Sequence, residues 1–193
     1  GDLIQDPADP NGWRLVSRPI NLDSRIREFT DLMVRYDFET ALGSFTATVD
    51  GTYFQKNLVN ITTAATGVVN QYRYDGTNFG PNRVQGRGEL MWSQGPWVAA
   101  FAMNYGSAYT WYNGIASRSS FTPLVTRHVS HYTTFDITGS YETRSGLRFV
   151  GGVTDLTNTD FPFVDEGMGF NSSKVNVQGR ALFMQVQKNF ALR

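Results

Sequence analysis

Alternation of apolar and polar residues recurs along this chain, and it constrains the fold more than any other feature. From Ser44 to Tyr53, one parity carries Phe, Ala, Val, Gly and Tyr, whereas the other carries Ser, Thr, Thr, Asp and Thr. A period of two places successive side chains on opposite faces of an extended strand. The same pattern predicts six further strands, Ile26 to Phe38, Asn82 to Ser93, Trp97 to Trp111, His128 to Glu142, Leu147 to Leu156 and Gly179 to Phe190. A weaker eighth, Trp13 to Ile20, follows the turn-like run Asp9-Pro10-Asn11-Gly12, and no helix-period segment competes with these strands.

The connections between the predicted strands are alternately short and long. The short ones are 40–43, 94–96 and 143–146, and the long ones are 58–81, 112–127 and 157–177. Antiparallel outer-membrane barrels have short periplasmic turns and long outer loops, whereas a soluble sandwich has no reason to keep its long loops on one side. We therefore expect an all-β fold, a segment of about seven or eight strands of an antiparallel transmembrane β-barrel.

Composition agrees with such a barrel and excludes other classes. Hydrophobic residues make up 40% of the 193 residues, and no stretch approaches the roughly 20 apolar residues that a membrane helix needs. In a barrel only every second residue faces lipid, so such strands average to mild polarity. The formal net charge is zero, which argues against a nucleic-acid partner. The chain has no cysteine, which removes disulfides and thiolate sites.

Candidate catalytic and metal-binding residues are few. His128 and His131 are the only histidines, and residues three apart on one strand point to opposite faces, so they cannot bind one metal ion together. No Gly-x-Ser-x-Gly elbow accompanies them. We predict no enzyme activity, no metal and no cofactor.

Aromatic residues near the predicted strand ends suggest membrane anchoring. Trp and Tyr are enriched at both interfaces of membrane proteins. This pattern assigns an interfacial role to Trp92, Trp97, Tyr109, Trp111 and Tyr112.

Several motifs resemble the C-terminal region of TonB-dependent outer-membrane receptors. They are Thr134-Phe135-Asp136-Ile137, Tyr141, Gly146-Leu147-Arg148-Phe149, the run from Gly151 to Phe163, and Gly179-Arg180, with Asn21, Thr30-Asp31-Leu32 and Tyr36 further upstream. The family usually shows an Asp in the antepenultimate strand, a Gly-x-x-Asn-Leu-x-(Asn/Asp)-x-x-Pro-Pro run and a Gly-Arg that opens the last strand. Here Phe29, Asp155 and Phe161 replace residues that are usually Gly, Asn and Pro.

The resemblance implies a place and a task for the chain. It implies that residues 1–193 are the C-terminal third of a barrel of about 22 strands, without the plug domain and the TonB-contacting motif. The implied location is the outer membrane of a Gram-negative cell, and the implied task is import of a nutrient such as a ferric siderophore. The implied partners are membrane lipid, the rest of the receptor, TonB through the missing plug, and a small-molecule ligand. Phe190 is the implied assembly signal, and Ala191, Leu192 and Arg193 follow it.

Two questions stay open at this level. The alternative to a fragment is a complete eight-stranded outer-membrane barrel with a binding or structural role, in which a set of charged residues would pair across the lumen. That set is Asp50, Arg87, Glu89, Asp136 and Arg148. Ligand contacts are expected from the three long loops, because such loops frame a binding vestibule, but no individual ligand-binding residue is predicted.

Overall fold

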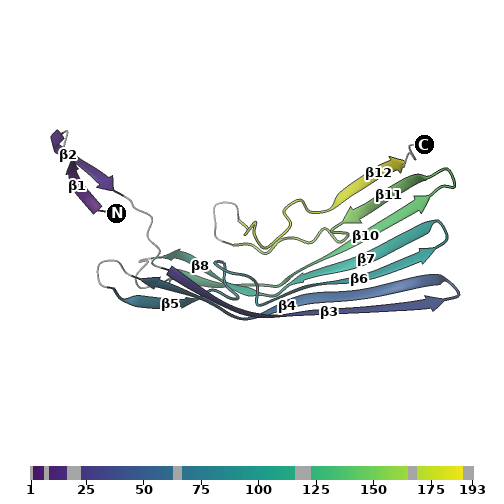
Figure 1. Cartoon of the computed structure of the whole chain (residues 1–193), viewed down its shortest axis with the longest axis horizontal. Coiled ribbons are helices and arrows are strands. Elements are labelled where there is room, and N and C mark those ends of the chain that lie inside the picture. The colour runs from purple at the N-terminus through teal and green to yellow at the C-terminus, as the bar shows by residue number, and fades with distance from the viewer. Residues whose placement is uncertain are drawn as a thin grey trace, which may run out of the picture.

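A computed structural model describes residues 2–6, 9–16, 23–62, 67–115, 123–164 and 169–188, with side chains in 24–62, 67–112, 126–164 and 169–188 (Figure 1). These residues form strands and no helix, and none of the described chain is a helix that could cross a membrane. The strands are β1 (Asp2–Asp6), β2 (Asp9–Val16), β3 (Asp23–Thr40), β4 (Gly43–Thr62), β5 (Val69–Arg73), β6 (Val84–Gln94), β7 (Trp97–Gly106), β8 (Tyr109–Ile115), β9 (Pro123–Val129), β10 (Tyr132–Glu142), β11 (Leu147–Thr154) and β12 (Ala181–Lys188).

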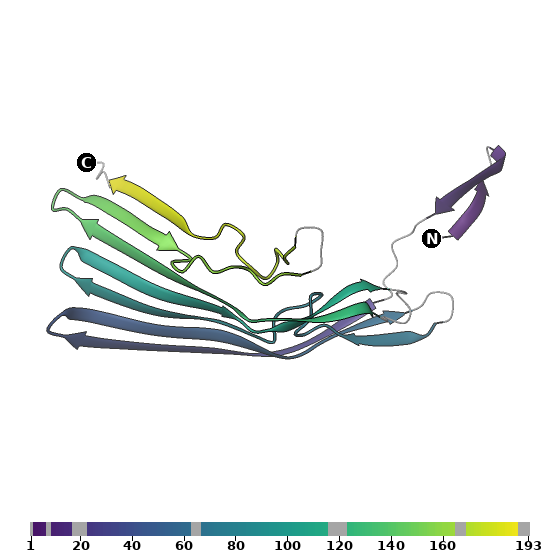
Figure 2. The same cartoon turned by 180° about the vertical axis from the view of Figure 1, so that it is seen from behind.

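One antiparallel sheet of eight strands dominates the structure. Its order is β12-β11-β10-β7-β6-β4-β3, and β5 pairs with the far part of β4. Each of the seven strongly alternating segments therefore contributes one strand to this sheet. The short turns gather at one end of this sheet and the long connections at the other, which Figures 1 and 2 show from opposite sides. Gly95 and Gly146 lie in two of these turns with φ of 56° and 77°, a conformation that favours glycine.

The strand register separates the side chains into an apolar and a polar face. Paired residues on neighbouring strands point to the same side of a sheet. One row crosses all seven strands and is apolar throughout, Tyr36, Ala47, Leu90, Phe101, Ile137, Val153 and Leu182. The adjacent row on the other face reads Arg35, Thr48, Glu89, Ala102 and Asp136. The alternation in each strand therefore becomes two chemically different faces of the whole sheet.

No second layer among the described residues covers the apolar face. The side chains of Tyr36, Phe101, Ile137 and Leu182 are 66%, 43%, 42% and 83% exposed. The two edge strands, β3 and β12, each pair with one neighbour within the described chain, so the sheet is open. A sheet with this much exposed apolar surface is complete only against another apolar phase or partner.

Three expectations fail at the long-connection end. The eighth strand of the sheet is β5, whereas residues 13–16 of the predicted strand from Trp13 to Ile20 lie in β2, which pairs with β1 in a separate hairpin, and residues 17–20 lie outside the described part of the chain. The predicted strand from Trp97 to Trp111 breaks after Gly106, and the one from His128 to Glu142 breaks at 130–131. The segments beyond these breaks, β8 and β9, pair with each other. Alternation continues through both breaks because a strand can change partners without changing its period.

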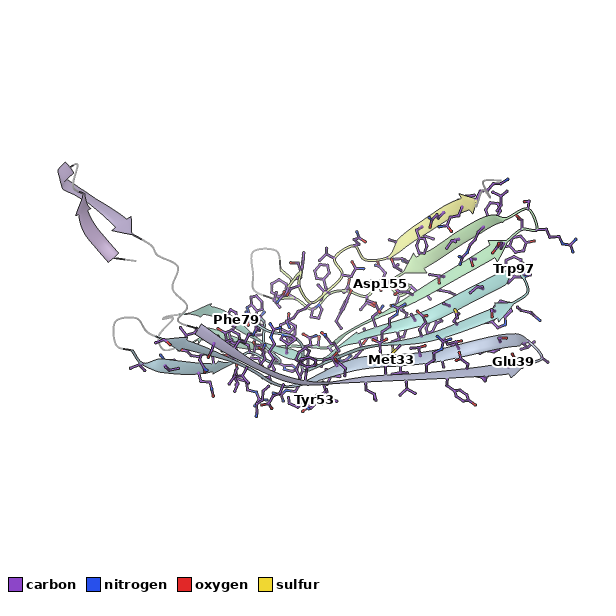
Figure 3. The ribbon with its side chains drawn as sticks, viewed as in Figure 1. Met33, Glu39, Tyr53, Phe79, Trp97 and Asp155 are labelled. Atoms are coloured by element: carbon purple, nitrogen blue, oxygen red, sulfur yellow. The ribbon has the colours of Figure 1, made fainter. Side chains whose placement is uncertain are left out.

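The long connections pack together into what we call the cap, namely β5, β8, β9 and the segments 74–83, 155–164 and 169–180. Tyr109, Trp111, Val129 and Val164 form a buried hydrophobic cluster there, with at most 5% exposure each. Phe79 stacks on Tyr112 with ring centroids 6.5 Å apart. Figure 3 places Phe79 at the cap end of the sheet and Trp97 and Glu39 at the short-turn end. The remaining part of the sheet, which we call the wall, carries the two faces described above.

Candidate functional site

A charged network lies on the polar face of the wall. Arg87 donates to Glu89 Oε2 at 2.8 Å and to Asn104 Oδ1 at 2.7 Å, and its Nη1 lies 3.5 Å from Asp136 Oδ2. Asn104 Nδ2 donates to the same Asp136 oxygen at 2.8 Å. The other oxygen of Asp136 accepts the backbone N–H of Asp155 at 3.0 Å. Side chains of β6, β7 and β10 are thus tied along the sheet, and the network joins the wall to the first residue after β11.

A cavity of about 550 Å³ opens on this polar face, where the wall meets the cap. Its floor is the polar face of β4, β6, β7 and β10, and two segments of the cap form its sides. The residues that line it are Asp50, Gly51, Thr52, Gly80, Pro81, Asn82, Gln85, Gly86, Asn104, Tyr105, Gly106, Tyr132, Thr134, Asp136, Thr154, Ser173, Lys174 and Asn176. The volume lies within the range of about 300–1,000 Å³ that small-molecule sites occupy.

Residues 171–176, which we call the strap, lie over one side of the cavity. Lys174 fastens the strap because its Nζ donates to Gly80 O and to Asn82 Oδ1, both at 2.7 Å. The same Nζ lies 4.6 Å from the centre of the Tyr109 ring, a cation–π contact. Burial lowers the pKa of Lys174 to about 8, since removal from water disfavours the charged amine. One side chain thereby holds two cap segments together beside the cavity.

The turn after β11 is built from residues of the family-like motif. Asp155 and Asn158 have φ of 49° and 52°, a left-handed conformation that Asp and Asn adopt more readily than most residues. The carboxylate of Asp155, only 1% exposed, accepts the backbone N–H of Thr159. Asn158 Oδ1 accepts the backbone N–H of Arg180 at 3.1 Å. These residues shape the turn and dock the start of β12 against it.

A buried carboxylate organises the opposite side of the cap. The Asp75 side chain is fully buried and lies 3.0 Å from Arg73 Nε and 3.2 Å from Arg83 Nη2. It also accepts the backbone N–H of Asn57 at 3.0 Å. These contacts fix the segment between β5 and β6 onto β4. A few residues later, at Gly80, the same segment lines the cavity.

Two of the three long connections reach the cavity. The connection 58–81 contributes Gly80 and Pro81, and the connection 157–177 contributes the strap. The connection 112–127 supplies no lining residue among those described. Part of what the sequence suggested as loop is strand, namely the end of β4, all of β5, residues 112–115 of β8 and residues 123–127 of β9. Lys174 and Asp75 carry no periodic or motif signal, and composition alone would not single them out.

The remaining predicted residues fall in different places. Trp97 is 53% exposed at the short-turn end and contacts Tyr141 with ring centroids 4.4 Å apart, and its interfacial role stays a prediction. The interfacial prediction is wrong for Tyr109 and Trp111, which are buried in the cap core. His128 lies on β9 opposite Thr110.

Some of the predicted residues lie outside the described part of the chain, and others contact a different partner from the one expected. Asn21 and Phe190 lie outside the described residues. His131 lies in the break between β9 and β10, and the centre of its ring is 6.1 Å from the centre of the Tyr105 ring. Among the charged residues proposed to pair across a closed lumen, Arg87, Glu89 and Asp136 pair along the sheet instead. Arg148 contacts Ser140 on the neighbouring strand at 3.4 Å.

Comparison of the chain with family models, curated proteins and solved structures finds no match in any of the three.

Proposed function

We propose that this chain is a wall segment of an outer-membrane β-barrel receptor, similar to the TonB-dependent receptors, that imports a small nutrient. One observation carries the proposal, namely a single-layer antiparallel sheet with an uncovered apolar face, a polar opposite face, and short turns segregated from long connections. Barrels of the outer membrane need this combination because lipid lies on one side of the wall and water or protein on the other.

The height of the apolar band supports a membrane setting. On β7 the band runs from Trp97 to Tyr105, and the eight steps between these residues, at about 3.4 Å each, give roughly 27 Å along the strand. A strand tilt of about 40° shortens this to roughly 21 Å, and the aromatic rings at both ends extend it toward the ~25 Å band of such barrels. Beyond Tyr53 the same face becomes charged, with an ion pair of 2.9 Å between Lys56 and Glu28.

The open edges support a partnership with further strands. Unpaired backbone groups cost several kcal/mol each in hydrocarbon, so an open sheet does not persist in a bilayer. In the proposal, β3 and β12 pair with the rest of the receptor wall. A complete eight-stranded barrel receives less support, because the described sheet has a path of seven strands and its charged residues pair along the sheet.

These 193 residues contain no cysteine, so no native thiol of this segment competes with an introduced one in a topology test. Single cysteines are introduced into the full-length protein in cells, two on the wall as Phe101→Cys and Thr48→Cys, and two at its ends as Ser172→Cys and Ser145→Cys. We expect a membrane-impermeant maleimide to label Ser172→Cys on intact cells but Ser145→Cys only after the outer membrane is permeabilised. The first site lies in the strap and the second in a short turn.

The two wall variants test which face meets lipid. Phe101→Cys should react with a lipid-soluble maleimide and resist a water-soluble one, because its side chain belongs to the apolar face. Thr48→Cys, on the polar face, is the matched position. Equal reaction of both variants with the water-soluble reagent would contradict a membrane wall, and labelling of Ser145→Cys on intact cells would contradict the orientation.

A further inference from the structure

We propose that the cavity beside the strap binds an uncharged, hydroxyl-rich ligand of the oligosaccharide class. This inference rests on the proposed function and narrows it, because it selects a neutral ligand over an anionic ferric chelate. It follows from the chemical groups that line the cavity and from which of them are already engaged.

The lining combines hydrogen-bonding groups of three kinds with little cationic charge. Its side chains are the carboxylates of Asp50 and Asp136, the amides of Asn82, Gln85, Asn104 and Asn176, and the hydroxyls of Thr52, Tyr132, Thr134, Thr154 and Ser173. Carboxylates only accept hydrogen bonds, whereas amides both donate and accept them. A ligand hydroxyl can also donate and accept. Most of these groups already pair within the protein, but neighbouring hydroxyls on a sugar ring can satisfy Asp50 and Gln85, which an apolar ligand would leave unpaired at a cost.

The charge of the cavity disfavours an anionic ligand. Lys174 is the one lining residue with a positive charge in the described cavity, against the carboxylates of Asp50 and Asp136, and Arg87 beside the cavity already offsets Asp136. The ammonium of Lys174 is already bound to Gly80 O and Asn82 Oδ1 and lies over the Tyr109 ring. A chelate with negative charge would thus meet the field of Asp50 without a free cation to offset it.

Two lining side chains remain available to a ligand. Asp50 and Gln85 make no polar side-chain contact with any residue in the described part of the chain, whereas Asp136 and Asn104 are engaged in the Arg87 network. Asp50 pairs with Arg87 in the register and Gln85 with Thr52, so Asp50 and Gln85 are diagonal neighbours on one face. Such neighbours lie about 7–8 Å apart at their Cα atoms, within reach of a single ligand.

Space for the ligand comes partly from a glycine. A Cβ added at Gly106 would lie 2.6 Å from Asn82 Nδ2, so a larger residue there would displace the side chain that holds Lys174. Gly106 therefore lets the loop at Asn82 approach the wall while the strap closes one side of the cavity.

The test uses the purified full-length protein and an array of neutral oligosaccharides, with ferric citrate as the anionic probe. The best array ligand is titrated against wild type, Asp50→Asn and Gln85→Ala. We expect each variant to bind it at least tenfold more weakly, because each loses a group that contacts ligand hydroxyls. Glu39→Gln and Gln185→Ala are matched controls, since both residues are exposed on the polar face outside the cavity, and both should bind normally.

The binding measurements either support or overturn the oligosaccharide proposal. The proposal is overturned if no array member binds, if binding is unchanged in both cavity variants, or if ferric citrate binds and Asp50→Asn strengthens its binding, as removal of a repelling charge would. The cysteine-labelling experiment separates this inference from the receptor proposal. Correct topology without oligosaccharide binding rejects the ligand class alone, whereas failed topology rejects the receptor itself.

Discussion

The wall and the cap of this chain are stabilised by different means. In the wall, neighbouring strands share regular backbone pairing over long stretches, and large apolar side chains such as Ile137 and Leu182 stay exposed. In the cap, strands are short, and Val164 and Trp111 are 0% and 5% exposed in a core of their own. The wall thus has pairing without a core, and the cap has a core with little regular pairing.

This difference shows where each part obtains its stability. Burial of apolar surface contributes roughly 25 cal/mol per Å², and the described wall leaves much of that contribution to its surroundings. The cap obtains this contribution internally, together with the ion pairs of the buried Asp75 carboxylate and hydrogen bonds that join residues far apart in sequence. In the proposed membrane setting, the effect of a substitution in the wall should therefore depend on the lipid, whereas a substitution in the cap should act locally.

The largest effect is expected from a charge on the apolar face of the wall. Ile137→Arg places a guanidinium in the middle of the row that crosses seven strands. An arginine at the bilayer midplane costs about 2–4 kcal/mol in an outer-membrane barrel. We expect a corresponding loss of stability in urea unfolding of the full-length protein in lipid vesicles, and reduced folded protein in the outer membrane.

Its matched control is the next residue on the same strand. Thr138 points to the polar face, so Thr138→Arg should change stability by about 0.5 kcal/mol or less. Equal destabilisation by the two substitutions would remove the distinction between the faces. Destabilisation by Thr138→Arg alone would reverse their assignment.

A smaller and local effect is expected from the buried carboxylate of the cap. Asp75→Ala leaves the N–H of Asn57 without its acceptor, at about 1–3 kcal/mol. The loss from the ion pairs is smaller than in a fully buried pair, because the Arg73 and Arg83 side chains are 54% and 49% exposed and can turn to water. Hydrogen exchange in lipid vesicles should show faster exchange in β5 and 74–83, with unchanged protection in β10.

The control for this substitution is a carboxylate on the wall. Asp31 is exposed and accepts one hydrogen bond, from Thr52 at 2.6 Å. Asp31→Ala should leave exchange in the cap unchanged. Loss of protection across β10 in Asp75→Ala would show that wall and cap unfold as one unit, against the comparison drawn here.

Sequence alone was sufficient for the wall. Period-two alternation predicts its seven strands, and the short turns at 95–96 and 143–146 fall where expected. The reason is physical, because in a single-layer sheet each residue faces one of two media and the pattern is repeated on every strand. The resemblance singled out Asp155 and, together with the lumen alternative, Asp136, and the hydrogen bond between them gives that part of the motif a structural role.

The cap could not be predicted in this way. Lys174 contacts Asn82, 92 residues earlier in the chain, and no local pattern signals such a pair. Alternation also continues from β7 into β8, so Tyr109 and Trp111 were assigned to the membrane interface although they are in the cap core. Periodicity reports that a segment is extended, but it does not report which strand it pairs with.

The smallest predicted effect concerns the strap and depends on pH. The pKa of Lys174 is about 8 when the strap is fastened, below its ordinary value of 10.5, so a released strap binds more protons between these two values. Stability of the fastened form therefore rises as pH increases from about 8 to 10.5, and it stays at its lower level below pH 8, where Lys174 is charged in both forms.

A spin label on Ser172→Cys should become less mobile from pH 7 to pH 10 in the otherwise unchanged protein. In Lys174→Met the label should be more mobile at pH 10 than in the protein with Lys174, because two hydrogen bonds are lost, and its mobility should not change with pH. A pH response that persists in Lys174→Met would assign the titration to another group.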